Sequence, residues 1–313
     1  MGKPNIFITG IILIFIMLSS FSFVSAGFFD FFRKGPQLSP NQPLGVNITV
    51  GNTAPQIIFV DVISPVDITE DSIVAVTFSF LARDVDGASN LNDASATASF
   101  NRSGEVTRSN PCSLIGVVDS TTKNYSCTIN IWYFDGAGTW IINATIADNN
   151  GLNIENTTTG FTLNPTTAIQ MSPGILTWNP LSIIDRNQTS NNDPLLLNNT
   201  GNDNNLGVNI TAIDLKGETT TTEYIFAGNF TIDIETGGVC SGASCIECDG
   251  TRMVNETTKL INGAVLPKGN HSINDGSTGQ EQLYFCMTAL NAISSQSYST
   301  AGGGTWTVLV SVP

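Results

Sequence analysis

Apolar and polar residues alternate with a period of two over much of the chain. The clearest run follows the triplet that starts at Gly138, where Ile142, Ala144 and Ile146 share one face. A second Gly-Thr-Trp triplet starts at Gly304 and opens another alternating run. A period of two places alternate side chains on opposite faces of a strand. The repeated triplet therefore predicts two β-modules in tandem, each with such a strand near its end.

The same pattern predicts further short strands separated by turn signals. In a first module, residues 47–165, strands are expected at 57–63 (a buried type of run), 74–82, 94–100, 125–133, 140–146 and a last one ending at 163. In a second module, residues 166–313, strands are expected at 206–212, 230–234, 282–290 and 306–312, and the Asn-rich stretch 187–205 is expected to be a loop. No long helical pattern follows the leader. The fold class expected is all-β, with two tandem antiparallel β-sandwiches.

The charge composition of the chain argues against two classes of binding partner. Only 12% of residues are charged, and 26 acids against 12 bases give a net charge of −14. Binding to nucleic acid or to an anionic membrane needs clustered Lys and Arg, so neither partner is expected.

The first 26 residues have the pattern of a secretory signal peptide, with Lys3, an apolar run and small residues before Ala26. An uncleaved membrane anchor is the alternative, and only then would the protein contact the membrane. Residues 27–46 then form an apolar, Phe-rich arm and a Pro-containing linker. The expected location is extracellular or at the cell surface.

The run from Gly138 through Asp148-Asn149-Asn150-Gly151 resembles the closing hairpin of bacterial and archaeal Ig-like surface domains. Residues 82–87, Ala-Arg-Asp-Val-Asp-Gly, resemble the Asp-rich turn of the same domains. The resemblance covers about 100 residues of the first module. The resemblance implies a secreted cell-surface protein of a prokaryote, an archaeon in particular, with tandem Ig-like β-sandwich domains. Because such motifs are shared by proteins of many functions, the resemblance supports the fold more than the function.

Six cysteines in an exported chain favour disulfides. Cys112 and Cys127 are alone in the first module and are expected to pair. The second module holds Cys240, Cys245, Cys248 and Cys286, which allow three pairings. We favour Cys240–Cys245 and Cys248–Cys286. The spacing is also that of a plant-type iron–sulfur site, but export in an unfolded state disfavours a cluster or a zinc site.

Hard oxygen ligands gather around Gly87, and the candidate ligands are Asp84, Asp86, Asn90 and Asp93, with Asn92 between the last two. They allow a calcium loop, although the final Glu of an EF-hand is missing. The alternative is an acidic turn that joins two strands. No other cofactor is expected.

Eleven Asn-x-Ser/Thr sequons make the protein a candidate glycoprotein, with Asn47, Asn143, Asn209 and Asn229 as the leading sites. Asn143 and Asn209 fall opposite the apolar faces of their strands, where a glycan would stand in water. Trp132, Tyr133 and Phe134 are a candidate sugar-stacking platform, or are divided between core and edge.

Three functions remain. The first is a non-enzymatic structural or adhesion module of the cell surface, which binds other surface proteins or itself through edge strands. The second is a carbohydrate- or ligand-binding protein. The third, a secreted hydrolase, lacks a catalytic constellation, because His271 is the single His and no Gly-x-Ser-x-Gly motif accompanies it. We therefore expect no enzyme activity.

Overall fold

A computed structural model describes residues 44–234 and 250–312. The expectations for the leader, for residues 27–43 and for Cys240, Cys245 and Cys248 lie outside the described residues. The described part is all-β, with strands, turns and short 3-10 helices. Within these ranges no helix is long and apolar enough to cross a membrane.

The first group of strands comes from residues 56–163. Its members are β1 (Gln56–Val60), β2 (Ile73–Arg83), β3 (Thr97–Asn101), β4 (Arg108–Val117), β5 (Thr122–Trp132), β6 (Gly138–Ala147) and β7 (Asn153–Leu163). Two 3-10 turns, η1 (Ala88–Asn90) and η2 (Asp93–Ser95), precede β3.

These strands pair in the order β1-β2-β5-β4-β3-β6-β7, and every pair is antiparallel. The strand β4 makes two different pairings along its length. Residues 108–111 pair with β3, and residues 112–117 pair with β5. The strand therefore leaves one layer and joins the other. Layers β1-β2-β5-β4 and β3-β6-β7 reproduce the two-sheet strand order of the immunoglobulin fold.

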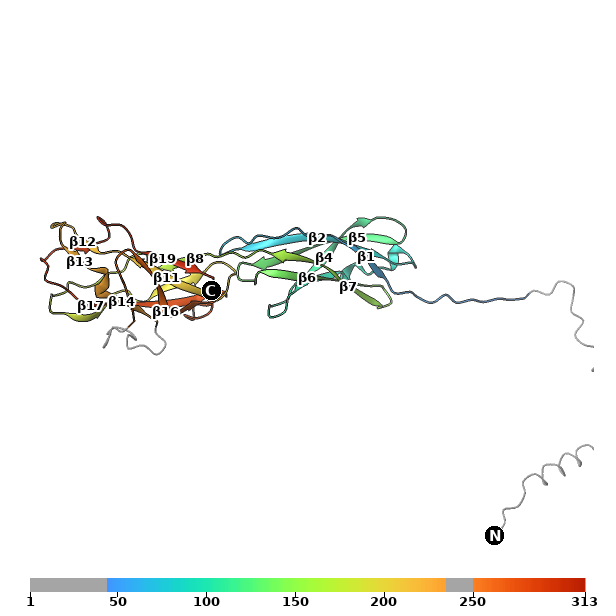
Figure 1. Cartoon of the computed structure of the whole chain (residues 1–313). Helices are drawn as coiled ribbons and strands as arrows, with labels where there is room; N and C mark the ends of the chain where they lie inside the picture. Colours follow the sequence, from blue (N-terminus) through green and yellow to red (C-terminus); the bar gives the residue numbers. More distant parts are fainter. Residues whose placement is uncertain (1–43, 235–249, 313) are drawn as a thin grey trace, which may run out of the picture. The chain divides into compact units, whose positions relative to one another are not determined.

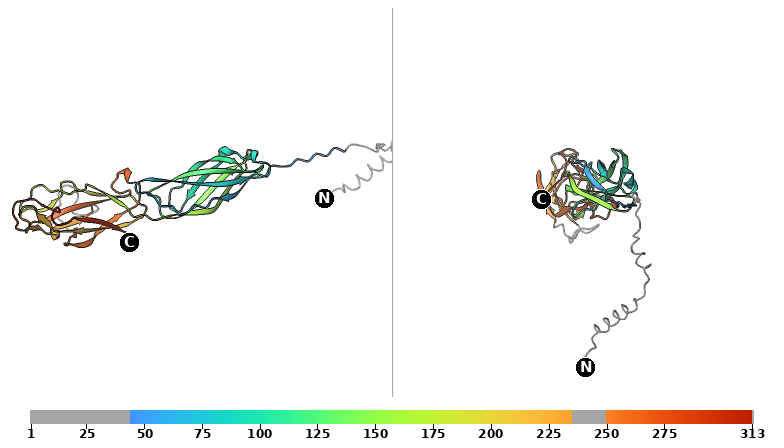
Figure 2. Two further views of the ribbon diagram at one scale, coloured as in Figure 1. Left: turned by 90° about the horizontal axis from the view of Figure 1, so that it is seen from above. Right: turned by 90° about the vertical axis from the view of Figure 1, so that its right-hand side faces the viewer.

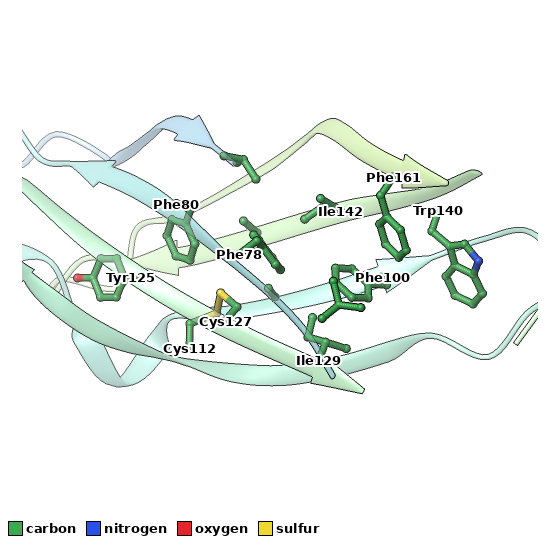
Figure 3. Close-up of a cluster of buried hydrophobic side chains, with 14 of the residues drawn as sticks. Phe78, Phe80, Phe100, Cys112, Tyr125, Cys127, Ile129, Trp140, Ile142 and Phe161 are labelled. Carbon is green, nitrogen blue, oxygen red and sulfur yellow. A yellow bond between two sulfur atoms is a disulfide. The ribbon is translucent and has the colours of Figure 1, made fainter. Parts of the chain in front are cut away.

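The core of this sandwich fills the space between the two layers. Trp140, Tyr125, Phe80 and Phe100 are its largest fully buried side chains. Phe100 of β3 lies 4.7 Å from the ring of Phe161 and 5.7 Å from that of Phe78 on β2, so the rings join both layers (Figure 3). The period-two prediction is confirmed for β2, β5 and β6, whose inward residues are buried.

Two expected strands differ from the structure and one strand was not predicted. The strand expected at 94–100 starts only at Thr97, because residues 93–95 form η2. The run 57–63 is an edge strand that ends at Val60, and Ile58 and Phe59 are about half exposed. Its apolar residues look like a buried strand only when the sequence is considered alone. The whole of β4 was missed, because Pro111 and the absence of alternation after Cys112 hide it. Pro111 lies where β4 changes partner, a position at which a missing N–H is tolerated.

The second group of strands begins at residue 169. Its members are β8 (Ile169–Ser172), β9 (Arg186–Thr189), β10 (Leu195–Asn199), β11 (Leu206–Ala212), β12 (Leu215–Gly217), β13 (Tyr224–Ile225), β14 (Phe230–Asp233), β15 (Thr251–Arg252), β16 (Thr257–Leu266), β17 (Gln280–Ala289), β18 (Tyr298–Ser299) and β19 (Thr307–Ser311), with the 3-10 turns η3 (Ala227–Asn229) and η4 (His271–Ile273).

These strands make three sheets. One has the path β15-β14-β17-β10-β8 with β9 also paired to β17, a second is β16-β11-β19, and a third is β13-β12-β18. A second buried cluster, separate from the first, includes Leu197, Val208, Ile232 and Phe285. The strands of each cluster lie together in Figure 1 and in the left view of Figure 2, blue to green for β1–β7 and yellow to red for most of the second group.

The prediction for 206–212 is confirmed, since Leu206, Val208, Ile210 and Ala212 are all buried. The prediction that 187–205 is a loop was wrong in part. Strand β10 lies inside this stretch, between β17 and β8, with Leu195 and Leu197 buried. Its three Leu residues are too short a run to show a period among the flanking Asn residues.

Candidate functional site

The most distinctive surface of the described chain is an uncharged strand edge, residues 113–118, which we name the β4 edge. On one side its residues up to Val117 pair with β5. On the other side no strand of the described residues pairs with them, because the β3 pairing ends at Pro111. Four apolar side chains are exposed here, 40% for Leu114, 58% for Ile115, 63% for Val117 and 57% for Val118.

The local sequence explains why this edge is open. Residues 93–95 form the 3-10 turn η2, so β3 starts only at Thr97. The last backbone hydrogen bond from β4 toward the β3 side is donated by the N–H of Cys112 to the carbonyl of Ala96, at 2.9 Å. Beyond Cys112 the pairing with β5 carries a bulge between Leu114 and Gly116. Bulges are common at sheet edges, where they bend a strand away from its neighbour.

A second exposed apolar segment is found at residues 44–50, which we name the arm segment. Leu44, Val46, Ile48 and Val50 alternate with Gly and polar residues, and they are 86%, 73%, 79% and 84% exposed. None of these residues belongs to a strand. The sequence left open whether residues 46–50 pair within their own module, and the described structure contains no such pairing.

The candidate calcium residues divide into two places. The carboxylate of Asp84, which is fully buried, accepts from the N–H of Asp86 at 2.9 Å and from the amide of Asn90 at 2.9 Å. Asp93 instead contacts Nζ of Lys123 at 2.8 Å and the hydroxyl of Tyr125 at 2.6 Å. Burial raises the pKa of Asp93, but the hydrogen bonds from Lys123 and Tyr125 outweigh it and lower the pKa.

Asp84, Asp86 and Asn90 form a hydrogen-bonded group that we name the Asp84 cluster. Asn52 and Asp148 extend this cluster, and the sequence did not predict either of them. Asn52 donates to Asp148 at 2.6 Å and accepts from Asn90 and from Asn150 at 3.0 and 2.7 Å. Asp148 is 1% exposed and lies in the turn that the sequence did predict. The signal that could have found it is this second turn of Asp and Asn residues, Asp148-Asn149-Asn150-Gly151. In the described ranges no group of three or more His, Cys, Asp or Glu residues is placed to hold a metal ion, and calcium stays a prediction.

The three consecutive aromatic residues Trp132, Tyr133 and Phe134, which we name the aromatic triplet, pack against one another. Trp132 stacks on Phe134 with ring centroids 5.7 Å apart, and Tyr133 meets Phe134 edge-on at 5.0 Å. Tyr133 is 4% exposed, and burial raises the pKa of its hydroxyl. Arg108 lies 5.7 Å over the Phe134 ring. Of the three, the Tyr133 ring has the least surface to offer a sugar.

His271 contacts residues of the first group of strands. Its Nε2 lies 2.8 Å from Oδ1 of Asp71, and its backbone N–H donates to the Tyr133 hydroxyl at 3.3 Å. Nearby in sequence, Lys268 forms an ion pair with Glu105 at 2.7 Å. The single His of the chain thus takes part in a contact between two loops.

A polar groove of about 320 Å³ crosses β3, β4 and β6. Thr97, Ser99, Asn110 and Thr145 are among the residues that line it. Asn143 also lines it, and its Oδ1 is buried without a hydrogen-bond partner. The groove lacks an aromatic side chain among its lining residues.

The pairing of Cys112 with Cys127 is confirmed. The two residues are directly opposite on β4 and β5 and form a disulfide with Cα atoms 4.3 Å apart (Figure 3). Cys286 is 1% exposed on β17 and is also disulfide-bonded. The favoured pairings of Cys240, Cys245 and Cys248 concern residues outside the described part.

The four leading sequons differ in exposure. Asn47 is exposed in the arm segment, whereas Asn143, Asn209 and Asn229 are half-buried. The amide nitrogen of Asn143 contacts Glu155 at 3.2 Å, that of Asn209 contacts Ser311 at 3.2 Å, and that of Asn229 contacts the carbonyl of Ala289 at 2.6 Å. Because a glycan is attached at this nitrogen, the Asn47 amide is the most accessible of the four.

Comparison with known proteins adds no family to this description. No protein-family model matches the chain, and a search of curated proteins finds no match.

Proposed function

We propose that this chain is an exported, non-enzymatic protein of the cell surface, and that its β-modules serve envelope structure or adhesion. The observation that carries the proposal is the exposed apolar β4 edge. Soluble β-proteins protect such edges with charges, Pro or a covering segment. Between residues 113 and 118 the β4 edge has a bulge but no charged residue and no Pro, and no strand of the described residues covers it, while its four apolar side chains are 40–63% exposed.

The rest of the chain supports a structural role. The Cys112–Cys127 disulfide suits a protein that works outside the cell. The leader expected over residues 1–26 and the abundant sequons point the same way. A net charge of −14 favours solubility and disfavours nucleic acid as a partner.

Localisation on native cells tests this proposal. Immuno-electron microscopy with an antibody against the second group of strands is expected to label the cell envelope or a surface filament. Label confined to the cytoplasm would contradict the proposal. The purified protein is also expected to turn over no member of a glycan or peptide library. Turnover that survives repurification would favour the hydrolase instead.

A carbohydrate-binding role is the second candidate, and the polar groove favours it. Its lining includes the hydroxyls of Thr97, Ser99 and Thr145 and the amides of Asn110 and Asn143, which are groups that hydrogen-bond to sugar hydroxyls. Binding to a glycan array that is lost in Asn143→Ala and retained in Trp132→Ala would assign the groove. Loss in Trp132→Ala alone would assign the aromatic triplet.

A further inference from the structure

We infer that the arm segment of one chain adds as a strand to the β4 edge of a second copy of this chain. This inference rests on the proposed function and names the partner and the two surfaces that meet. The occupant is residues 46–50, Val-Asn-Ile-Thr-Val, and the acceptor is residues 113–118, Ser-Leu-Ile-Gly-Val-Val. The contact is heterologous, because the two surfaces differ and each chain carries one of each.

The backbone of the β4 edge supplies the recognition. A strand paired on one side only presents unpaired N–H and C=O groups to an added strand. Residues 113–117 are paired with β5 alone among the described strands. No Pro interrupts them, so none of the N–H groups that point away from β5 is missing. The acceptor is therefore able to continue the layer by one more antiparallel or parallel strand.

The side chains of the acceptor are uncovered in a way that fits an apolar strand. Cys112 and Leu114 share a face, since residues two apart in a strand point the same way. Cys112 is 8% exposed on this inward face, but Leu114 on the same face is 40% exposed. Among the described residues no strand therefore covers Leu114 on this inward face.

The arm segment has the complementary pattern. In an extended strand Val46, Ile48 and Val50 would share one face, and Asn47 and Thr49 would share the other. As an added strand it would place three β-branched side chains against Leu114 and leave the two polar side chains in water. In the described part of the single chain these three side chains are 73–84% exposed.

The distribution of charge along the chain also favours contact between the arm segment and the β4 edge. A chain with 26 acids and 12 bases repels its own copies over most of its surface. The arm segment and the β4 edge carry no ionisable side chain, so they are places where two copies approach without that penalty. The edge is uncharged up to Asp119, and the arm segment is followed by uncharged residues as far as Asp61.

Cysteine trapping in the full chain tests the inference. One preparation carries Ile48→Cys, and a second carries Leu114→Cys or Val117→Cys. When the two are mixed under mild oxidation, an intermolecular disulfide between position 48 and position 114 or 117 is expected, identified by mass spectrometry of the linked peptides. Matched controls move each substitution to an equally exposed apolar residue, Val62→Cys (83% exposed) for the donor and Val106→Cys (66% exposed) for the acceptor. These pairs are expected to link several-fold less.

Charge insertion provides an independent measurement. Val117→Lys and Ile48→Lys are each expected to remove the oligomers seen by sedimentation of the unaltered chain, and Val106→Lys and Val62→Lys to retain them. Unchanged melting temperatures show that the substitutions leave the fold intact. The inference is overturned if mixed preparations link no more than the controls. It is also overturned if a chain with both Ile48→Cys and Val117→Cys links only within itself at every concentration.

The two proposals can fail separately. Envelope labelling of native cells without any trapped link would contradict the strand addition and leave the surface role standing. A trapped link in a protein found only in the cytoplasm would contradict the surface role and leave the strand addition standing.

Discussion

Gly138 and Gly304 have similar positive φ angles, 125° and 114°. Each lies two residues before a tryptophan whose indole N–H donates to a carbonyl. Trp140 donates to Gly136 at 3.0 Å and Trp306 to Ile213 at 2.8 Å. The repeated triplet thus has a physical meaning: a backbone turn that only Gly adopts readily, followed by a Trp that anchors a strand to the core.

Replacement of either Gly tests this relationship. Gly138→Ala and Gly304→Ala force an L side chain into this φ range and are each expected to destabilise the fold by about 1–3 kcal/mol. Gly116→Ala is the matched control, because a Cβ there meets nothing within 4 Å and φ is not positive. Urea unfolding measures all three. Equal midpoints for Gly138→Ala and Gly116→Ala would contradict the assignment.

The buried ion pair of Arg108 and Asp135 is expected to dominate local stability. Arg108 Nε lies 3.0 and 3.1 Å from the two carboxylate oxygens, and Asp135 is 1% exposed. Arg108→Ala leaves a buried charge without its partner and is expected to cost about 3–5 kcal/mol in free energy of unfolding. Arg102→Ala breaks the more exposed pair with Glu105 and is expected to cost under about 1 kcal/mol. If Arg108→Ala and Arg102→Ala lowered the free energy of unfolding by similar amounts, the burial of the Arg108–Asp135 pair would not be the reason for its importance.

The Cys112–Cys127 disulfide closes a loop with a sequence separation of 15. In the chain-entropy model a loop of about this size stabilises by about 3 kcal/mol, since it restricts the unfolded chain. Replacing both residues with Ala is expected to lower the free energy of unfolding by about that amount, as measured in urea under non-reducing conditions. A dithiothreitol-treated sample of the unaltered chain serves as the comparison. A double variant as stable as the unaltered chain would remove this role.

Glu223 is expected to make the small sheet β13-β12-β18 sensitive to acid. Hydrogen bonds from Ser294, Tyr298 and Gln296 lower the pKa of Glu223 from 4.5 to about 2. A pKa lowered by folding gives stability that is present above the unfolded value and is lost as the pH falls toward the folded one. The difference in melting temperature between the unaltered chain and Glu223→Gln is therefore expected to be largest above pH 4.5 and to shrink toward pH 2. Glu218→Gln, in the same strand connection but with an exposed side chain, is the control for the removal of one carboxylate.

Calcium binding at the Asp84 turn is the remaining prediction of the sequence. Calcium at about 100 times its dissociation constant would stabilise the folded chain by about 2.7 kcal/mol. The expected result is a rise in melting temperature that Asp84→Asn abolishes and Asp119→Asn, in an exposed turn, retains. No heat in calorimetric titration and no shift in melting temperature would leave this cluster as a hydrogen-bonded acidic turn.

The sequence by itself determined the all-β class and much of the first sandwich. Strands with one buried and one exposed face reveal themselves through their period, as β2, β5, β6 and β11 do. The Cys112–Cys127 pair also followed from the sequence, because the two residues were the only cysteines within that module. These features depend on local patterns that survive without knowledge of the partners.

Only the tertiary structure decided which strands meet and where an edge stays open. The change of partner along β4 depends on where β3 starts, and no local pattern in residues 108–117 records this. The hydrogen bond between Asn52 and Asp148 joins residues 96 apart, and Asp93 turns to Lys123 rather than to its sequence neighbours. Periodicity is a property of one strand, whereas pairing and the surroundings of a polar group depend on residues that folding brings from far along the chain.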